Sequence, residues 1–184
     1  MVESLYKACK EASETFELIV DTREQLTERY KKRIEAFKSL GVTPIRQKLY
    51  AGDYSAIAKI GTHTIDYTTR VALERKKDLN ELVTCLSGTS RQRFEAELRR
   101  AYLCRCRLYI VVEEGSYADL VAGNFFNHVD PQKVLACYHT FEQRYGCHFV
   151  FVPPEVFPKF AHETLRRFIM DDLKPKVEAQ KLII

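Results

Sequence analysis

The sequence predicts one α/β domain, in which a mixed β-sheet is flanked by helices on both faces. Three observations favour this fold class. Apolar strand-like segments alternate with amphipathic helical segments, the early strands form a hairpin pattern, and no repeat or Gly/Ser linker divides the chain. With 184 residues, 46% of them hydrophobic and 29% charged, one substantial core can form. We expect a single domain over residues 1–184, with its core at about residues 16–152.

The first half of the chain predicts two helices and then a group of strands. Residues 3–13 fit a short helix, and residues 16–21 (FELIVD) form an apolar run that ends in an acid, as in a buried strand. A second helix is predicted by apolar residues at helical spacing, namely Leu26, Tyr30, Ile34 and Phe37, with Gly41 as its stop. Strands follow at residues 44–49, 54–60, 62–69 and 71–73, with Gly61 as a hairpin turn.

The second half alternates helices with strands. Helices are expected at residues 79–86, from Arg91 onward, at residues 131–145 and at about residues 154–171. Apolar strands are expected at residues 108–112 (LYIVV) and 148–152 (HFVFV). A polar tail without an evident role follows the last helix.

Composition argues against several classes of protein. The longest apolar runs are far below the ~20 residues of a membrane helix, and the acidic N-terminus (MVESLYKACKEASE) lacks the apolar block of a secretory signal. We therefore expect an intracellular protein without a membrane partner. The size of the chain argues against a disulfide scaffold, and the cysteines and histidines lack the spacing of a zinc site. No Gly-rich phosphate loop is present.

Positive charge is concentrated in one segment. The whole chain has a net charge of +4, and residues 91–107 contain six arginines against two glutamates. This concentration fits contact with phosphates, although a solvated helix face with Glu–Arg pairs is an equally common explanation.

Three acidic motifs occur in order, each at the end of a predicted strand: Asp21-Thr-Arg-Glu24, Gly52-Asp53-Tyr54 and Glu74-Arg75-Lys76. Side chains alternate along a strand, so Glu74 and Lys76 share one face and Arg75 needs a partner on the other. Carboxylates hold hard divalent cations, and a lysine can orient or help deprotonate the attacking water. Taken singly, each motif is usually a helix cap, a turn or a surface charge run.

In this order the motifs resemble the nuclease domain of the xeroderma-pigmentosum-group-F (XPF) family. The segment Tyr109-Ile-Val-Val-Glu113 is also similar, and the resemblance covers about residues 16–114 well and extends loosely to Phe151. It implies a restriction-endonuclease-like fold and Mg²⁺- or Mn²⁺-dependent cleavage of branched DNA such as flaps, forks or nicked junctions. It also implies a role in repair or recombination and pairing as a homodimer.

The resemblance assigns roles to particular residues. Asp53 and Glu74 are the implied metal ligands, and Lys76 is the implied water-activating lysine. The acidic pair that completes the site is Asp21 and Glu24, with Asp21 as a third ligand. Arg75 matches the middle residue of the triplet. The arginine-rich helix supplies candidate DNA contacts at Arg91, Arg93 and Arg99.

Two departures from the family pattern bear on function. Asn80 stands where the family usually has an aspartate, and Asp78 lies nearby as a candidate substitute. No helix-hairpin-helix pattern follows Phe151, so a compact stand-alone member from a bacterium or phage fits best. Two alternatives stay open: a non-catalytic DNA-binding scaffold subunit of the same fold, and a restriction-type nuclease that acts on linear duplex.

Overall fold

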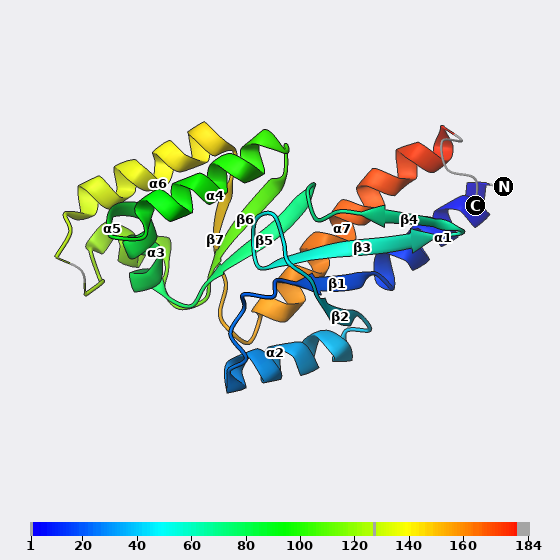
Figure 1. Cartoon of the computed structure of the whole chain (residues 1–184), viewed down its shortest axis with the longest axis horizontal. Coiled ribbons are helices and arrows are strands. Elements are labelled where there is room, and N and C mark those ends of the chain that lie inside the picture. The colour runs from blue at the N-terminus through cyan, green and yellow to red at the C-terminus, as the bar shows by residue number, and fades with distance from the viewer. Residues whose placement is uncertain (1, 127, 180–184) are drawn as a thin grey trace.

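A seven-stranded mixed sheet forms the centre of the computed structural model, which describes residues 2–126 and 128–179 (Figure 1). The strands are β1 (Glu17–Val20), β2 (Thr43–Arg46), β3 (Tyr54–Ile60), β4 (His63–Asp66), β5 (Val71–Lys76), β6 (Arg107–Val112) and β7 (His148–Phe151). Their order in the sheet is β2-β1-β3-β5-β6-β7, and β4 pairs with β3 beside this path.

Helices pack around this sheet in the described ranges (Figure 1). They are α1 (Val2–Glu14), α2 (Glu28–Ser39), α3 (Leu79–Ser87), α4 (Arg91–Leu103), α5 (Tyr117–Ala122), α6 (Pro131–Tyr145) and α7 (Phe157–Glu178). None of the helices in the described part of the chain is long and apolar enough to cross a membrane.

The strand directions confirm the predicted mixed sheet. Strand β3 runs antiparallel to β1, β4 and β5, and β5, β6 and β7 are mutually parallel neighbours. The hairpin of β3 and β4 turns at Gly61, as predicted. The first pair, β1 and β2, is parallel. Helix α2 lies between these two strands in sequence and provides the crossover that a parallel pair requires.

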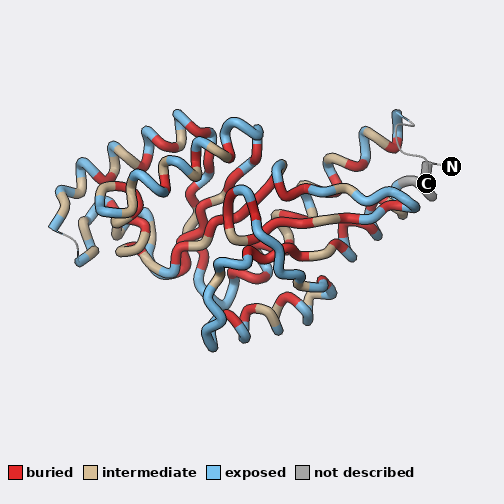
Figure 2. Tube along the Cα trace, in the orientation of Figure 1, coloured by how far each residue is buried: buried red, intermediate tan, exposed pale blue. Residues whose placement is uncertain are grey.

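Two apolar cores lie on opposite faces of the sheet, which confirms the prediction of helices on both faces. Strand β5 contributes to both, because Val71 and Leu73 pack in one core and Ala72 packs in the other. The first core is shared with α1, α2 and α7, and the second with α3, α4, α5 and α6. Figure 2 shows the buried residues running along the central strands and the inner faces of the helices.

The C-terminal helix is longer than predicted. Helix α7 continues to Glu178, so the expected polar tail after residue 171 is helical up to that point. The extension follows from apolar residues at helical spacing, since Leu173 and Val177 are buried in line with Leu165 and Ile169. Residues 180–184 of the expected tail lie outside the described residues.

Candidate active site

The predicted Glu-Arg-Lys motif forms the last three residues of strand β5. Glu74 and Lys76 point to the same side, and the Lys76 Nζ atom lies 2.6 Å from Glu74 Oε1. Both residues are buried, with 7% and 6% of their surface exposed. The strand gives way to α3 at Asp78, whose carboxylate accepts a hydrogen bond from the Glu81 N–H and caps the helix. The expected carboxylate–ammonium pair is therefore formed.

Asp53 reaches the same place from the start of β3. Its backbone N–H donates to the Leu73 carbonyl at 2.8 Å, and its Oδ2 atom accepts from the Arg75 N–H at 2.8 Å. Gly52 permits this approach: its φ is +79°, and a Cβ atom there would lie 2.9 Å from the Ala72 Cβ atom. The Asp53 carboxylate is therefore fixed beside Glu74 by the backbone of β5.

These side chains lie in a cleft of about 630 Å³. One wall is the segment between β1 and α2, and the opposite wall comes from the starts of α3 and α4. The lining residues are Arg23, Glu24, Gln25, Thr27, Arg29, Asp53, Glu74, Arg75, Lys76, Lys77, Glu81, Arg93, Glu97 and Arg100. Six of the nine predicted site and contact residues line the cleft, namely Glu24, Asp53, Glu74, Arg75, Lys76 and Arg93.

Two arginines and two glutamates form a closed ring beside the cleft. Arg33 and Arg75 each contact both Glu24 and Glu113, with N···O distances of 2.8 and 3.3 Å for Arg33 and of 3.3 and 2.9 Å for Arg75. The Tyr54 hydroxyl donates to Glu24 at 3.2 Å. Arg75 thus has the salt-bridge partners that its position on β5 required, and Glu24 serves the ring rather than standing as a free carboxylate.

Asp21 holds a loop rather than facing the cleft. Its carboxylate is fully buried and accepts hydrogen bonds from the Arg23 N–H at 2.7 Å and from the Leu49 N–H at 2.7 Å. The Arg23 guanidinium makes two further bonds to the same carboxylate. The Asp21 backbone N–H donates to the Asp53 carbonyl at 2.8 Å, so the two residues are neighbours. The Asp21 carboxylate nevertheless does not line the cleft with those of Asp53 and Glu74. Its partners decide the placement of this carboxylate: Arg23 follows β1, and Leu49 lies in the loop before β3.

Electrostatics in the cleft favour a cation. Burial, followed by the charge of Glu74, raises the pKa of Asp53 well above its ordinary value. Burial also raises the pKa of Glu74, and the neighbouring Lys76 charge offsets only part of this shift. Burial alone would lower the pKa of Lys76, but the Glu74 carboxylate outweighs it and the pKa is raised, which keeps the lysine protonated. Two buried carboxylates are thus held close together, at a free-energy cost that a bound cation would relieve.

Asp53 and Glu74 offer carboxylate oxygens to the divalent metal that the resemblance implies. Asp53 and Glu74 each engage one carboxylate oxygen in the hydrogen bonds described, which leaves the second oxygen of each for a cation. Among the described residues no group of three or more His, Cys, Asp or Glu side chains forms a ready-made metal site. A pair of carboxylates suits Mg²⁺, which keeps several waters and accepts phosphate oxygens, so these two residues fit such an ion.

The three arginines predicted to contact DNA have different environments. Arg93 is exposed and lines the cleft, and Arg99 is exposed on α4 but lies outside the cleft. Arg91 is half-buried and donates to the Leu86 carbonyl at 3.1 Å, with its guanidinium over the Phe141 ring. Arg91 is therefore occupied within the protein and unavailable to a ligand in the cleft.

Asn80 and Asp78 also have defined partners. Asn80 Oδ1 accepts a hydrogen bond from the Phe126 N–H at 2.7 Å and so ties α3 to the segment after α5. Asp78 is committed to the cap of α3, which argues against its replacing the family's aspartate. Neither side chain contacts Lys76 in a described hydrogen bond or ion pair.

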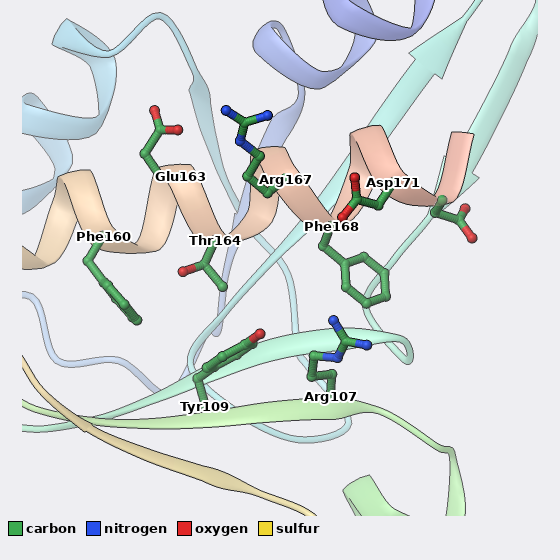
Figure 3. A pocket seen from close by; sticks show the side chains of 9 residues that line it. Arg107, Tyr109, Phe160, Glu163, Thr164, Arg167, Phe168 and Asp171 are labelled. Atoms are coloured by element: carbon green, nitrogen blue, oxygen red, sulfur yellow. The ribbon is translucent and has the colours of Figure 1, made fainter. Parts of the chain in front are cut away.

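A second cavity, of about 570 Å³, lies between α7 and β6 (Figure 3). Phe160, Thr164 and Phe168 point from α7 toward Tyr109 and Arg107 on β6 (Figure 3). None of the predicted site residues lines it. Two of its acids are ion-paired, Glu163 with Lys159 and Arg166, and Asp172 with Arg70 and Lys176. The predicted acidic motifs lie outside this cavity, so the candidate active site is the cleft that contains Asp53, Glu74 and Lys76.

Two residues in and beside the cleft, Glu97 and Arg33, were not predicted. Glu97 accepts a hydrogen bond from the Gly52 N–H at 2.9 Å and joins α4 to the loop that carries Asp53. Arg33 belongs to the ring although it lies on the buried side of α2, between Tyr30 and Phe37 at helical spacing. A charged residue within an apolar stripe was the signal that could have identified Arg33. Glu97 had no comparable signal.

The fold and the cleft define a class of protein: an α/β domain of the restriction-endonuclease-like type, with two carboxylates and a lysine where two central strands meet. The model of the ERCC4 domain family matches residues 20–156, which include Asp53, Glu74 and Lys76. The chain therefore belongs to the ERCC4 domain family, the family of the XPF nucleases.

Two solved structures of XPF from Aeropyrum pernix are similar to this chain in fold. The first is 18% identical with a TM-score of 0.58, and the match covers 82% of this chain and 60% of that one. The second, a complex with DNA, is 19% identical with a TM-score of 0.58, and covers 85% of this chain and 66% of that one. The matched region thus spans less than two thirds of those XPF chains. No curated protein matches the chain.

Proposed function

We propose that this chain is a divalent-metal-dependent endonuclease that hydrolyses DNA phosphodiester bonds at branched structures, such as flaps, forks or junctions, in repair or recombination. One observation carries the proposal: the buried Glu74–Lys76 pair lies beside Asp53 in a cleft whose walls also present arginines. The XPF structure from Aeropyrum pernix in complex with DNA supports the choice of DNA as the substrate.

The acidic residues of the cleft would bind the metal, and the basic residues would bind the phosphate and the water. Asp53 and Glu74 would hold Mg²⁺ or Mn²⁺, which would supply Lewis-acid chemistry to the phosphate and an activated water. Lys76, ion-paired to Glu74, orients the attacking water and offsets negative charge on the phosphate. Arg93 and Arg100, on the cleft wall, bind the flanking phosphates and position the strand.

Two further parts support this machinery without touching the phosphate. The ring of Glu24, Arg33, Arg75 and Glu113 fixes the underside of β5, so that Glu74 and Lys76 keep their orientation. Asp21 holds the loop that leads to Asp53 through its bonds to Arg23 and Leu49. In this proposal Asp21 is a positioning residue.

The test is a set of flap, fork, four-way junction and linear duplex substrates, each incubated with Mg²⁺ or Mn²⁺. We expect the wild-type chain to cut branched substrates, and Glu74→Gln to bind them without cutting. Cleavage by clean Glu74→Gln protein at the wild-type rate would overturn the assignment of the site. If linear duplex is cut as fast as the branched substrates, the activity is of the restriction type and not selective for branches. Sedimentation of the same protein tests whether the chain forms a homodimer.

A further inference from the structure

One aromatic side chain stands out on the loop of residues 47–52, between β2 and β3. Leu49 and Ala51 are buried, with 3% and 2% of their surface exposed, whereas Tyr50 between them is 50% exposed. Exposing half of a tyrosine leaves a large apolar ring in water. Tyr50 precedes Asp53 by three residues, so the ring is close in sequence to the proposed metal ligand.

The exposure of Tyr50 does not come from a loose loop. The Leu49 N–H is held by Asp21 at 2.7 Å, and the Leu49 carbonyl accepts from Arg23 at 3.3 Å. The Tyr50 carbonyl accepts from Arg100 Nε at 3.1 Å. The backbone on both sides of the ring is therefore anchored, and the ring is presented from a fixed position.

The anchors also locate Tyr50 relative to the cleft. Arg23 and Arg100 both line the cleft, and they bind the two consecutive carbonyls of Leu49 and Tyr50. The backbone that carries Tyr50 thus lies beside two cationic side chains of the cleft. An aromatic ring flanked by cations is the combination with which proteins bind single-stranded nucleic acid, by stacking on a base while the cations contact the backbone.

We propose that Tyr50 is a stacking platform for an unpaired nucleobase next to the phosphate that the cleft holds. The ring would discriminate between unpaired and paired nucleotides, since a base within a duplex is already stacked on both faces. This inference rests on the proposed function and adds a residue that binds the unpaired strand.

A matched control separates this role from ordinary surface exposure. Tyr6 has nearly the same exposed fraction, 52%, but it lies on α1, which packs against α7 and contributes no residue to the cleft. Tyr50→Phe keeps the aromatic ring and removes only the hydroxyl. Tyr50→Ala removes the ring from an exposed position, so the fold should be retained, and urea unfolding of each variant checks this.

The experiment measures binding of a labelled single-stranded oligonucleotide and of the matching duplex by fluorescence anisotropy, with Ca²⁺ in place of Mg²⁺. Tyr50→Ala should weaken single-strand binding by about 5- to 100-fold, while Tyr50→Phe and Tyr6→Ala match the wild type. Duplex binding and the salt dependence should not change, because no phosphate contact is lost.

Two results with Tyr50→Ala would overturn this inference without affecting the proposed function. The first is wild-type affinity for the single strand, and the second is an equal loss of affinity for single strand and duplex. A Tyr50→Phe variant as weak as Tyr50→Ala also removes the stacking role, because the hydroxyl would then be the contact. Failure of the wild-type chain to bind any DNA overturns the proposed function as well, so the two failures are distinguishable.

Discussion

The ammonium of Lys76 lies 2.6 Å from the carboxylate of Glu74, and both side chains are buried in the wall of the cleft. The pair is neutral as a unit, so β5 can carry two charges into a poorly solvated place. Asp53 is the carboxylate that remains without a lysine of its own, which marks where an added cation is most needed.

Replacing Lys76 by Met should separate catalysis from metal binding. The variant keeps the length of the side chain but loses the ammonium, and we expect cleavage to fall by about 100-fold or more. Mn²⁺ binding followed by calorimetry should persist, because Asp53 and Glu74 remain. Lys59→Met, on the exposed side of β3, is the control with wild-type cleavage. Normal turnover in Lys76→Met would remove the lysine from the mechanism.

Two glycine substitutions should differ in effect although both glycines have positive φ. Gly52 has φ +79° and a Cβ atom there would lie 2.9 Å from Ala72 Cβ and 3.0 Å from the Leu73 carbonyl oxygen. Gly41 has φ +84° with nothing within 4 Å. Urea unfolding should show a loss of about 1 kcal/mol for Gly41→Ala, from backbone strain alone. Gly52→Ala adds overpacking and should lose about 2–4 kcal/mol. Equal losses would contradict the close approach of this loop to β5.

Breaking the ring of Arg33, Arg75, Glu24 and Glu113 should be costly. Arg33→Met leaves two glutamates short of a partner in a buried place, and we expect a loss of about 3–5 kcal/mol in the free energy of unfolding. Arg29, also on α2, forms an exposed pair with Glu114, and its replacement should cost about 0–1 kcal/mol. A small effect for both would mean that water enters the ring.

His162 should make stability depend on pH. It is buried against Phe16, and Nδ1 lies 3.4 Å from Glu163 Oε1 without a well-formed hydrogen bond. Burial lowers the pKa of His162, although Glu163 works in the opposite direction. Lys159 and Arg166 add positive charge nearby. The unfolded chain therefore binds the proton more readily, and stability falls as pH decreases through the ordinary value of about 6.5 toward the lowered folded pKa.

His162→Leu removes this proton-linked loss. Thermal unfolding should show a larger gain over the wild type at pH 5.5 than at pH 8. A gain that is the same at both pH values would show that His162 takes up its proton equally well in the folded and unfolded chain.

Local signals account for the elements that were predicted well. Helix α6 begins with Pro131 at its first turn and ends before Gly146 in the left-handed conformation, so its bounds coincide with the prediction. Strand β3 was equally well marked by the turn at Gly61. Helix α5 was missed because it is six residues long and has little room for a periodic pattern.

The candidate site was predictable where strand alternation decides it and not where tertiary contacts do. The shared side of Glu74 and Lys76 follows from two-residue spacing alone. Asp21 also ends an apolar run, but the N–H of Leu49, 28 positions away, holds its carboxylate away from the cleft. Glu97 accepts a hydrogen bond from the N–H of Gly52, 45 positions away, and no local sequence pattern predicts such a contact.

The ring of two arginines and two glutamates has a consequence for how sequences in this family can change. Each arginine contacts both glutamates, so a single substitution at any of the four positions leaves a buried charge uncompensated. Substitutions that preserve the fold must then remove one arginine and one glutamate of the ring together. Related sequences should show Glu24, Arg33, Arg75 and Glu113 covarying, retained together or lost together.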